Sequence, residues 1–137
     1  LLHNLEELLQ TNFQENNISF TLWCSPEPMM TEGDEKQLSQ VFLNLLKNAM
    51  QALEGHPHGE LSLQAEQDEY IVIDITDNGP GIPPEIMDKV FIPFFTTKSE
   101  GTGIGLSLCK EIIRRHEGHL AIKESRAGKT VFHIELP

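Results

Sequence analysis

Residues 70–81, with the sequence YIVIDITDNGPG, contain the change of pattern on which the fold prediction rests. Isoleucines from Ile71 to Ile75 alternate with other residues, as in a half-buried strand, and so point to one face. Asp77 has the same parity, which predicts a carboxylate on the core side, where an unpaired charge costs several kcal/mol. The alternative is an Asp77 that turns outward and caps the turn before Gly79.

Three further stretches have the pattern of strands. Leu61 to Glu66 alternates like Tyr70 to Asp77, and the short connection between them predicts an antiparallel hairpin. Leu120 to Glu124 and Val131 to Leu136 close the chain as two more strands. Thr130 has the inward parity of the last strand, so we expect it to meet the carboxylate of the hairpin at one end of a pocket.

Helical periodicity occurs near the N-terminus and again before the hairpin. The first helix is expected from about Leu5 to Glu15, where Asn4 and Glu7 resemble a capping box. The second has Asp34 as its N-cap and Gly55 beyond its end. Its apolar face consists of Leu38, Val41, Phe42, Leu45, Ala49, Ala52 and Leu53.

A stretch without core periodicity follows the hairpin. Gly79 to Gly105 contains five of the ten glycines and four of the eight prolines, so it is a long loop of the kind that is usually functional or disordered. A third helix is expected from about Ile104 to His116, stopping at Gly118, and a strand from Ile18 to Leu22 precedes the second helix. This order predicts an α/β (α+β) two-layer sandwich with a mixed, mostly antiparallel sheet and helices on one face.

Length and composition limit the class of protein. The 137 residues fit one domain, 1–137, and no apolar run approaches the ~18 residues of a membrane span. A net charge of −11 has the wrong sign for gripping nucleic acid. Cys24 and Cys109 have no metal or redox spacing and are expected as small buried hydrophobes, which fits a reducing cytoplasm. Because the chain begins at Leu1, we expect it to be part of a longer protein.

Two groups of residues have the chemistry of a phosphate site. Gly101, Gly103 and Gly105 lead into a helix, whose free N–H groups and dipole favour phosphate, although a flexible lid is the alternative. Asn44 and Asn48 lie four apart on one side of a helix, ~6 Å from each other. Such a pair can hold Mg²⁺ and phosphate oxygens, or it can simply be satisfied by backbone at a packing boundary. Lys47 and Lys98 are the candidate cations nearby.

Five segments in a fixed order carry a further signal: QVFLNLLKNA at 40–49, DNGPG at 77–81, FIPFFTTK at 91–98, GTGIGL at 101–106 and GKTVF at 128–132. Together they resemble the N box, first glycine box, F box, second glycine box and last turn of the catalytic, ATP-binding domain of bacterial sensor histidine kinases, in the GHKL superfamily. The resemblance spans nearly the whole chain and implies the Bergerat-type ATP-binding fold.

The resemblance also implies a set of site residues. Asp77 accepts the exocyclic amine of adenine, Asn48 ligates Mg²⁺, and the segment from Phe91 to Gly105 is a lid over the triphosphate. Because this stretch lacks core periodicity, we expect its Phe91 to Thr102 portion to be mobile without nucleotide. The residues implied in ATP binding are Asn44, Lys47, Asn48, Asp77, Gly79, Gly81, Ile82, Phe91, Lys98, Gly101, Thr102, Gly103, Ile104, Gly105, Leu106 and Thr130.

Asn44 separates the classes within the superfamily. Its ATPases carry a glutamate at this position as the base that activates water, and an amide cannot take that proton usefully at pH 7. We therefore expect a γ-phosphate positioned for an outside nucleophile, with Asn44 and Asn48 as the catalytic pair. The alternatives are an ATPase module of the MutL or gyrase type and a degenerate nucleotide-binding switch.

The family's nucleophile is a histidine on a separate dimerisation domain. None of the six histidines here has the acidic residue directly after it and the proline five positions on that mark the acceptor; His3, for example, is followed by Asn4. His116 and His119 are expected at a helix end and a strand start. The resemblance thus implies an acceptor domain outside these residues, a response regulator, a homodimeric parent and a cytoplasmic location, alone or beneath a membrane-anchored sensor, with no direct membrane contact.

Overall fold

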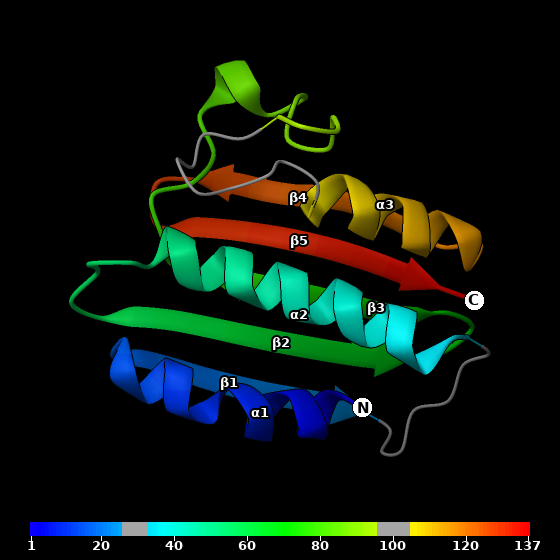
Figure 1. Cartoon of the computed structure of the whole chain (residues 1–137), viewed down its shortest axis with the longest axis horizontal. Coiled ribbons are helices and arrows are strands. Elements are labelled where there is room, and N and C mark those ends of the chain that lie inside the picture. The colour runs from blue at the N-terminus through cyan, green and yellow to red at the C-terminus, as the bar shows by residue number, and fades with distance from the viewer. Residues whose placement is uncertain (26–32, 96–104) are drawn as a thin grey trace.

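The structure is a computed structural model that describes residues 1–25, 33–95 and 105–137 (Figure 1). Its elements in chain order are α1 (Leu2–Glu15), β1 (Ile18–Ser25), α2 (Glu35–Ala52), β2 (Gly59–Gln67), β3 (Ile71–Asp77), the short 3₁₀ helix η1 (Pro84–Ile86), α3 (Gly105–Arg115), β4 (His119–Arg126) and β5 (Lys129–Leu136). Each predicted helix and strand is present. Four strands extend beyond the predicted bounds by up to three residues at an end, whereas β3 begins at Ile71, one residue later than predicted.

The five strands form one sheet in the order β1-β2-β3-β5-β4. Strand β1 runs parallel to β2, and the other neighbours are antiparallel. Figure 1 shows α1, α2 and α3 lying across the same face of this sheet. The two-layer sandwich with a mixed, mostly antiparallel sheet is therefore confirmed.

The core lies between the helices and the sheet. Inward residues of β2 and β3 alternate strictly with less buried ones, as the period-2 pattern requires. The predicted apolar face of α2 is confirmed, except that Ala52 is exposed. The largest fully buried side chains of the core are Leu45, Leu46, Leu53, Leu61, Leu63, Ile75, Ile113, Leu120, Ile134, Val41 and Cys109.

The helix starts differ in how well they were predicted. Asp34 caps α2 as expected, since its side chain accepts a hydrogen bond from the Gln37 N–H at 3.1 Å. The capping box at Asn4 is wrong, because α1 already begins at Leu2 and has no side-chain cap. Leu2 packs against the core, and this tertiary contact extends the helix past the local cap signal.

The end of α3 gives Gly118 a different role from the one expected. The left-handed residue after the helix is Glu117, with φ +60°, and the Gly118 N–H donates to the Ile113 carbonyl at 2.9 Å. A Cβ at Gly118 would collide with the carbonyl oxygen of Glu135. Glycine is thus required here by the close approach of β5, and His116 and His119 lie at the helix end and strand start as predicted.

Candidate functional site

Asp77 lies at the end of β3 on the helix-covered side of the sheet. Its side chain is 4% exposed, which confirms the inward parity. The β3–β5 register pairs Asp77 with Thr130, also 4% exposed, and the β2–β3 register pairs Asp77 with Leu61. The carboxylate and the hydroxyl therefore meet at one end of the sheet, as their parity predicted.

Within the described residues, the Asp77 carboxylate has one backbone donor and no cationic partner. The Gly79 N–H donates to Asp77 Oδ1 at 2.9 Å, so the turn-capping bond of the alternative interpretation forms while the side chain stays buried. Burial raises the pKa of Asp77, and the Gly79 hydrogen bond lowers it in part. Within the described residues no ion pair or further hydrogen bond of Asp77 is present, which leaves Oδ2 for another donor.

The turn after Asp77 is held tightly between two neighbours. A Cβ at Gly79 would lie 3.1 Å from the Ala52 carbonyl oxygen at the end of α2. Gly81 has φ +85°, and a Cβ there would lie 2.6 Å from the Arg126 carbonyl oxygen. The Gly128 N–H donates to the Gly79 carbonyl at 2.8 Å. Gly81 is therefore required by a contact within the protein, whatever ligand approaches it, and a side chain at Gly79 would crowd the Ala52 carbonyl.

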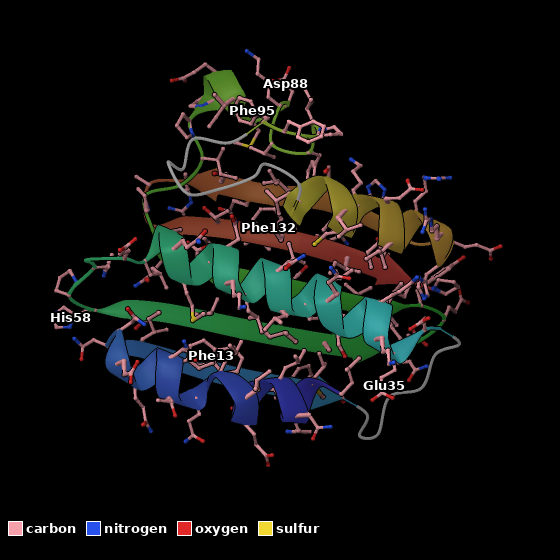
Figure 2. The ribbon with its side chains drawn as sticks, viewed as in Figure 1. Phe13, Glu35, His58, Asp88, Phe95 and Phe132 are labelled. Carbon is pink, nitrogen blue, oxygen red and sulfur yellow. The ribbon has the colours of Figure 1, made fainter. Side chains whose placement is uncertain are left out.

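Asn78 is a residue of this turn whose contribution the sequence analysis missed. Its Oδ1 accepts from the Glu60 N–H at 2.7 Å, and its Nδ2 donates to the His58 carbonyl at 2.9 Å. The Asn78 N–H also donates to the Glu60 carbonyl at 3.2 Å. Figure 2 shows His58 at the end of the sheet where α2 also ends. The amide therefore fastens the turn to the start of β2.

Apolar side chains continue the site beyond the turn. Ile82 packs against the core, and its N–H donates to Ser125 Oγ at 2.7 Å. The Phe91 ring meets Phe132 edge-on at 6.3 Å between centroids, and Leu106 on α3 is half-buried. These residues tie the ends of the long loop to the core.

A hollow of about 440 Å³ lies on the outer side of α3. It is lined by Phe91, Pro93, Ser107, Leu108, Lys110, Glu111 and Arg114. Among the predicted site residues that the structure describes, Phe91 borders it and Asp77 does not. This hollow is therefore separate from the end of the sheet where Asp77 and Thr130 meet.

The paired amides lie on α2. Asn44 and Asn48 are half-buried, and Lys47 is exposed. Burial raises the pKa of the Cys109 thiol to about 11, and a hydrogen bond with the Asn44 side chain counteracts this. Asn44 thus has a side-chain partner on α3, not the backbone partner of the alternative interpretation. Cys109 is buried as predicted, whereas Cys24 is half-buried.

Part of the predicted site lies outside the described residues. This holds for Lys98, Gly101, Thr102, Gly103 and Ile104 and for most of the expected lid, while Gly105 is the first residue of α3. In the described ranges, no group of three or more His, Cys, Asp or Glu side chains could hold a metal ion.

Residues 33–137 match the family described as "Histidine kinase-, DNA gyrase B-, and HSP90-like ATPase". The chain belongs to this family. Within the ATPase family its relatives are sensor kinases. It is 38% identical to sporulation kinase C of Bacillus subtilis over 141 aligned residues, covering 100% of this chain and 32% of that protein. It is 40% identical to the sensory histidine kinase/phosphatase NtrB of Rhodobacter capsulatus, covering 78% of this chain and 33% of that protein.

Solved structures agree with this membership in the ATPase family. The nucleotide-free catalytic domain of histidine kinase ThkA superposes with a TM-score of 0.88 at 32% identity, covering 98% of this chain and 88% of that one. ThkA in complex with the response regulator TrrA gives 0.83 at 30% identity, covering 99% and 39%. The chain spans about a third of the length of sporulation kinase C and of NtrB. No helix in the described ranges has the length and apolar character needed to cross a bilayer.

Proposed function

We propose that this ATPase-family domain binds ATP·Mg²⁺ and presents the γ-phosphate to a histidine on a separate dimerisation domain of a sensor kinase. The observation that carries this proposal is the buried Asp77 carboxylate, which has one oxygen on the Gly79 N–H and no cationic partner within the described residues. A buried anion of this kind is suited to a ligand that brings its own donor.

In this proposal Asp77 recognises adenine. Oδ2 accepts the exocyclic amine, while the Gly79 N–H holds Oδ1 and so fixes the plane of the carboxylate. Thr130 is the register partner of Asp77 and supplies a hydroxyl beside it. GTP is rejected because its carbonyl would face the carboxylate, so that neither group has a proton to share.

The residues present are compatible with Mg²⁺. Magnesium is usually held by one or two protein oxygens plus phosphates and waters, so it needs no cage of carboxylates. Asn48 is the proposed ligand, with Asn44 and Lys47 beside the phosphates on α2. The ion would neutralise charge on the β- and γ-phosphates.

The proposed reaction needs an outside nucleophile. Asn44 offers no base for activating water. Two histidines of the chain already form hydrogen bonds within the fold. His116 Nε2 accepts from the Asp34 N–H, and His133 Nδ1 pairs with the Asp74 carboxylate. A histidine nitrogen of the acceptor domain would attack phosphorus and ADP would leave. The proposal includes a homodimeric parent and a response regulator as the next acceptor, and the structure of ThkA in complex with the response regulator TrrA supports the regulator.

The test uses γ-labelled ATP with the chain alone and then with the dimerisation domain of its own parent protein in trans. We expect tight Mg²⁺-dependent ATP binding, weak GTP binding, very slow hydrolysis by the chain alone, and labelled histidine only with the acceptor. Asn48→Ala should suppress the transfer. Asn44→Glu is the opposite test, because it introduces a carboxylate at the position where the superfamily's ATPases have their base.

The results separate the alternatives. Rapid hydrolysis by the unmodified chain would favour the ATPase module. Normal ATP binding without labelling of a folded acceptor would favour a nucleotide-binding switch. Equal affinity for ATP and GTP would contradict the role of Asp77.

A further inference from the structure

Helices α2 and α3 run antiparallel (Figure 1). Hydrogen bonds from His116 and Cys109 to the backbone of the α2 segment join them. At one end, the Asp34 N–H at the start of α2 donates to His116 Nε2, just past the end of α3, at 3.0 Å. Further along, the Cys109 thiol donates to the Val41 carbonyl at 3.7 Å. Both contacts use a backbone group of the α2 segment and a side chain of the α3 segment.

The His116 contact has a fixed direction. Its Nδ1 lies 2.8 Å from the Ile112 carbonyl, which can only accept, so the ring proton is on Nδ1. Nε2 then carries the lone pair that the Asp34 N–H needs. The ring also packs tightly against the backbone before α2, because a Cβ at Gly33 would lie 2.8 Å from His116 Cδ2. The imidazole is therefore held in position and orientation from both sides.

The Cys109 contact lies at the centre of the helix pair. The side chain is fully buried, at 0% exposed, and the thiol reaches the backbone of α2 one turn before Asn44. The same sulfur is hydrogen-bonded to the Asn44 side chain. A sulfur that touches both Val41 and Asn44 connects the position of α3 to the orientation of a proposed site residue.

The spacing of the two contacts defines a register. Asp34 and Val41 are seven residues apart, as are Cys109 and His116, so the contacts repeat after two turns of each helix. One further heptad along α2 leads to Asn48. The corresponding step along α3 passes its first residue, Gly105. In this register Asn44, three residues after Val41, lies level with Leu106, three residues before Cys109, and Asn48 lies one turn beyond the N-terminal end of α3.

We propose that Cys109 and His116 are positioning residues that fix the sliding register of α3 against α2, and thereby the placement of the N-terminal end of α3 relative to Asn44 and Asn48. The inference rests on the proposed function for its consequence in nucleotide binding, but not for the register itself. A shift by one residue moves a helix ~1.5 Å along its axis, and misplacement by ~1 Å is enough to impair a phosphate-positioning site.

The test compares variants that keep the packing volume with variants that keep the polar contact. His116→Leu and Cys109→Val remove the hydrogen bonds and remain bulky. His116→Gln keeps an acceptor near the position of Nε2, and Cys109→Ser keeps a donor. Arg115→Ala is the control, because the Arg115 guanidinium binds Glu111 on its own helix. ATP·Mg²⁺ affinity is measured by calorimetry beside the melting temperature, and crystal structures give the separation of Asn48 and Gly105.

We expect His116→Leu and Cys109→Val each to weaken ATP·Mg²⁺ binding by up to about tenfold, because a displaced α3 no longer presents its N-terminal end to the phosphates in the right place. His116→Gln and Cys109→Ser should recover most of the affinity, and Arg115→Ala should match the unmodified chain. The crystal structure of His116→Leu should show α3 displaced along α2.

Two results would overturn the proposal. One is an unchanged helix register in both His116→Leu and Cys109→Val, whether or not ATP binds. The other is equal loss of affinity in all four variants in step with their melting temperatures, which would mean that they act only through stability. An unmodified chain that binds no ATP would instead contradict the proposed function, and the structures of the variants would still decide the register.

Discussion

Asp74 and Asp77 lie three residues apart on β3, yet on opposite faces of the sheet and in opposite electrostatic surroundings. Asp74, on the face without helices in the described ranges, accepts from Lys123 Nζ at 3.2 Å and contacts His133 Nδ1. Asp77, beneath the helices, accepts only a backbone N–H. The fold thus neutralises one carboxylate itself and leaves the other without a counter-charge among the described residues.

The difference identifies which carboxylate is available to a ligand. A paired surface carboxylate contributes modestly to stability and is screened by salt. A buried carboxylate whose pKa is raised by burial is costly in the ligand-free fold, so it is a candidate for binding a ligand that brings its own donor. The predictions below test this contrast between the two aspartates.

The largest effect is expected from Asp77→Asn. The variant should bind ATP about 10- to 100-fold more weakly, because a charge-assisted hydrogen bond worth ~1.5 to 3 kcal/mol is lost. Its ligand-free melting temperature at neutral pH should not fall, since a buried charge has been removed. Calorimetry and thermal unfolding measure the two quantities, and Asp74→Asn is the matched control. Weakened binding in the control alone would reverse the comparison.

Gly81→Ala should disturb Asp77 through its turn. The new Cβ would meet the Arg126 carbonyl oxygen at a residue with φ +85°. Gly55→Ala isolates the backbone cost, because Gly55 has φ +78° and nothing within 4 Å of a Cβ. We expect Gly81→Ala to lower the free energy of unfolding by at least ~1 kcal/mol more than Gly55→Ala does. Equal losses in urea titrations would mean that the turn yields without cost.

The two faces should also differ in pH dependence. Burial raises the pKa of Asp77, so its contribution to stability is present below 3.8 and is lost as pH rises through the raised value. For His133, burial opposes the charge, but hydrogen bonds with Asp74 and Glu135 outweigh it and raise the pKa. That contribution is present below 6.5 and is lost as pH rises above it.

Each of these two pH-dependent contributions to stability should be lost in one variant only. The free energy of unfolding is measured by urea titration from pH 3 to 9 for each variant and for the unmodified chain. The difference between variant and unmodified chain should change with pH in the acidic range for Asp77→Asn and near neutrality for His133→Gln. If His133→Gln left the pH dependence of stability near neutrality unchanged, His133 would not bind its proton more tightly in the folded state than in the unfolded state.

The smallest effect is expected from Asp74→Asn itself. Its ion pair with Lys123 is partly exposed, with side-chain exposures of 58% for Lys123 and 25% for Asp74. The loss in unfolding free energy should be at most ~1 kcal/mol and should shrink in high salt. Thermal unfolding at two salt concentrations measures it.

Local periodicity explains what could be predicted. Alternation is a short-range signal, so it was enough to place Asp77 and Thr130 on the core side, and the register pairs them. The contacts of Asn78 join it to residues 18 and 20 positions away, and no local pattern reports such partners. The cap at Asn4 failed for a related reason, because the packing of Leu2 outweighs a local preference.

The same limit applies to the helix pair. Apolar spacing predicted α2 and α3, but not that Cys109 and His116 would contact the α2 segment, since the two helices are far apart in sequence. The sequence placed the end of α3 at Gly118 correctly, but it did not show why a glycine is needed there. Gly118 lies at the helix end, yet it is required by the carbonyl of Glu135, whereas Glu117 takes the left-handed conformation.

The strand order has a consequence for how the protein folds. β2 and β3, and likewise β4 and β5, are sequence neighbours that can pair early, but the β3–β5 pairing closes a loop that contains the whole segment from η1 to β4. Closing long loops is entropically costly and slows folding. Asp77 and Thr130 face each other across this late pairing, so nucleotide binding would report completion of the native sheet, and nascent or partly folded chains would be unable to sequester ATP.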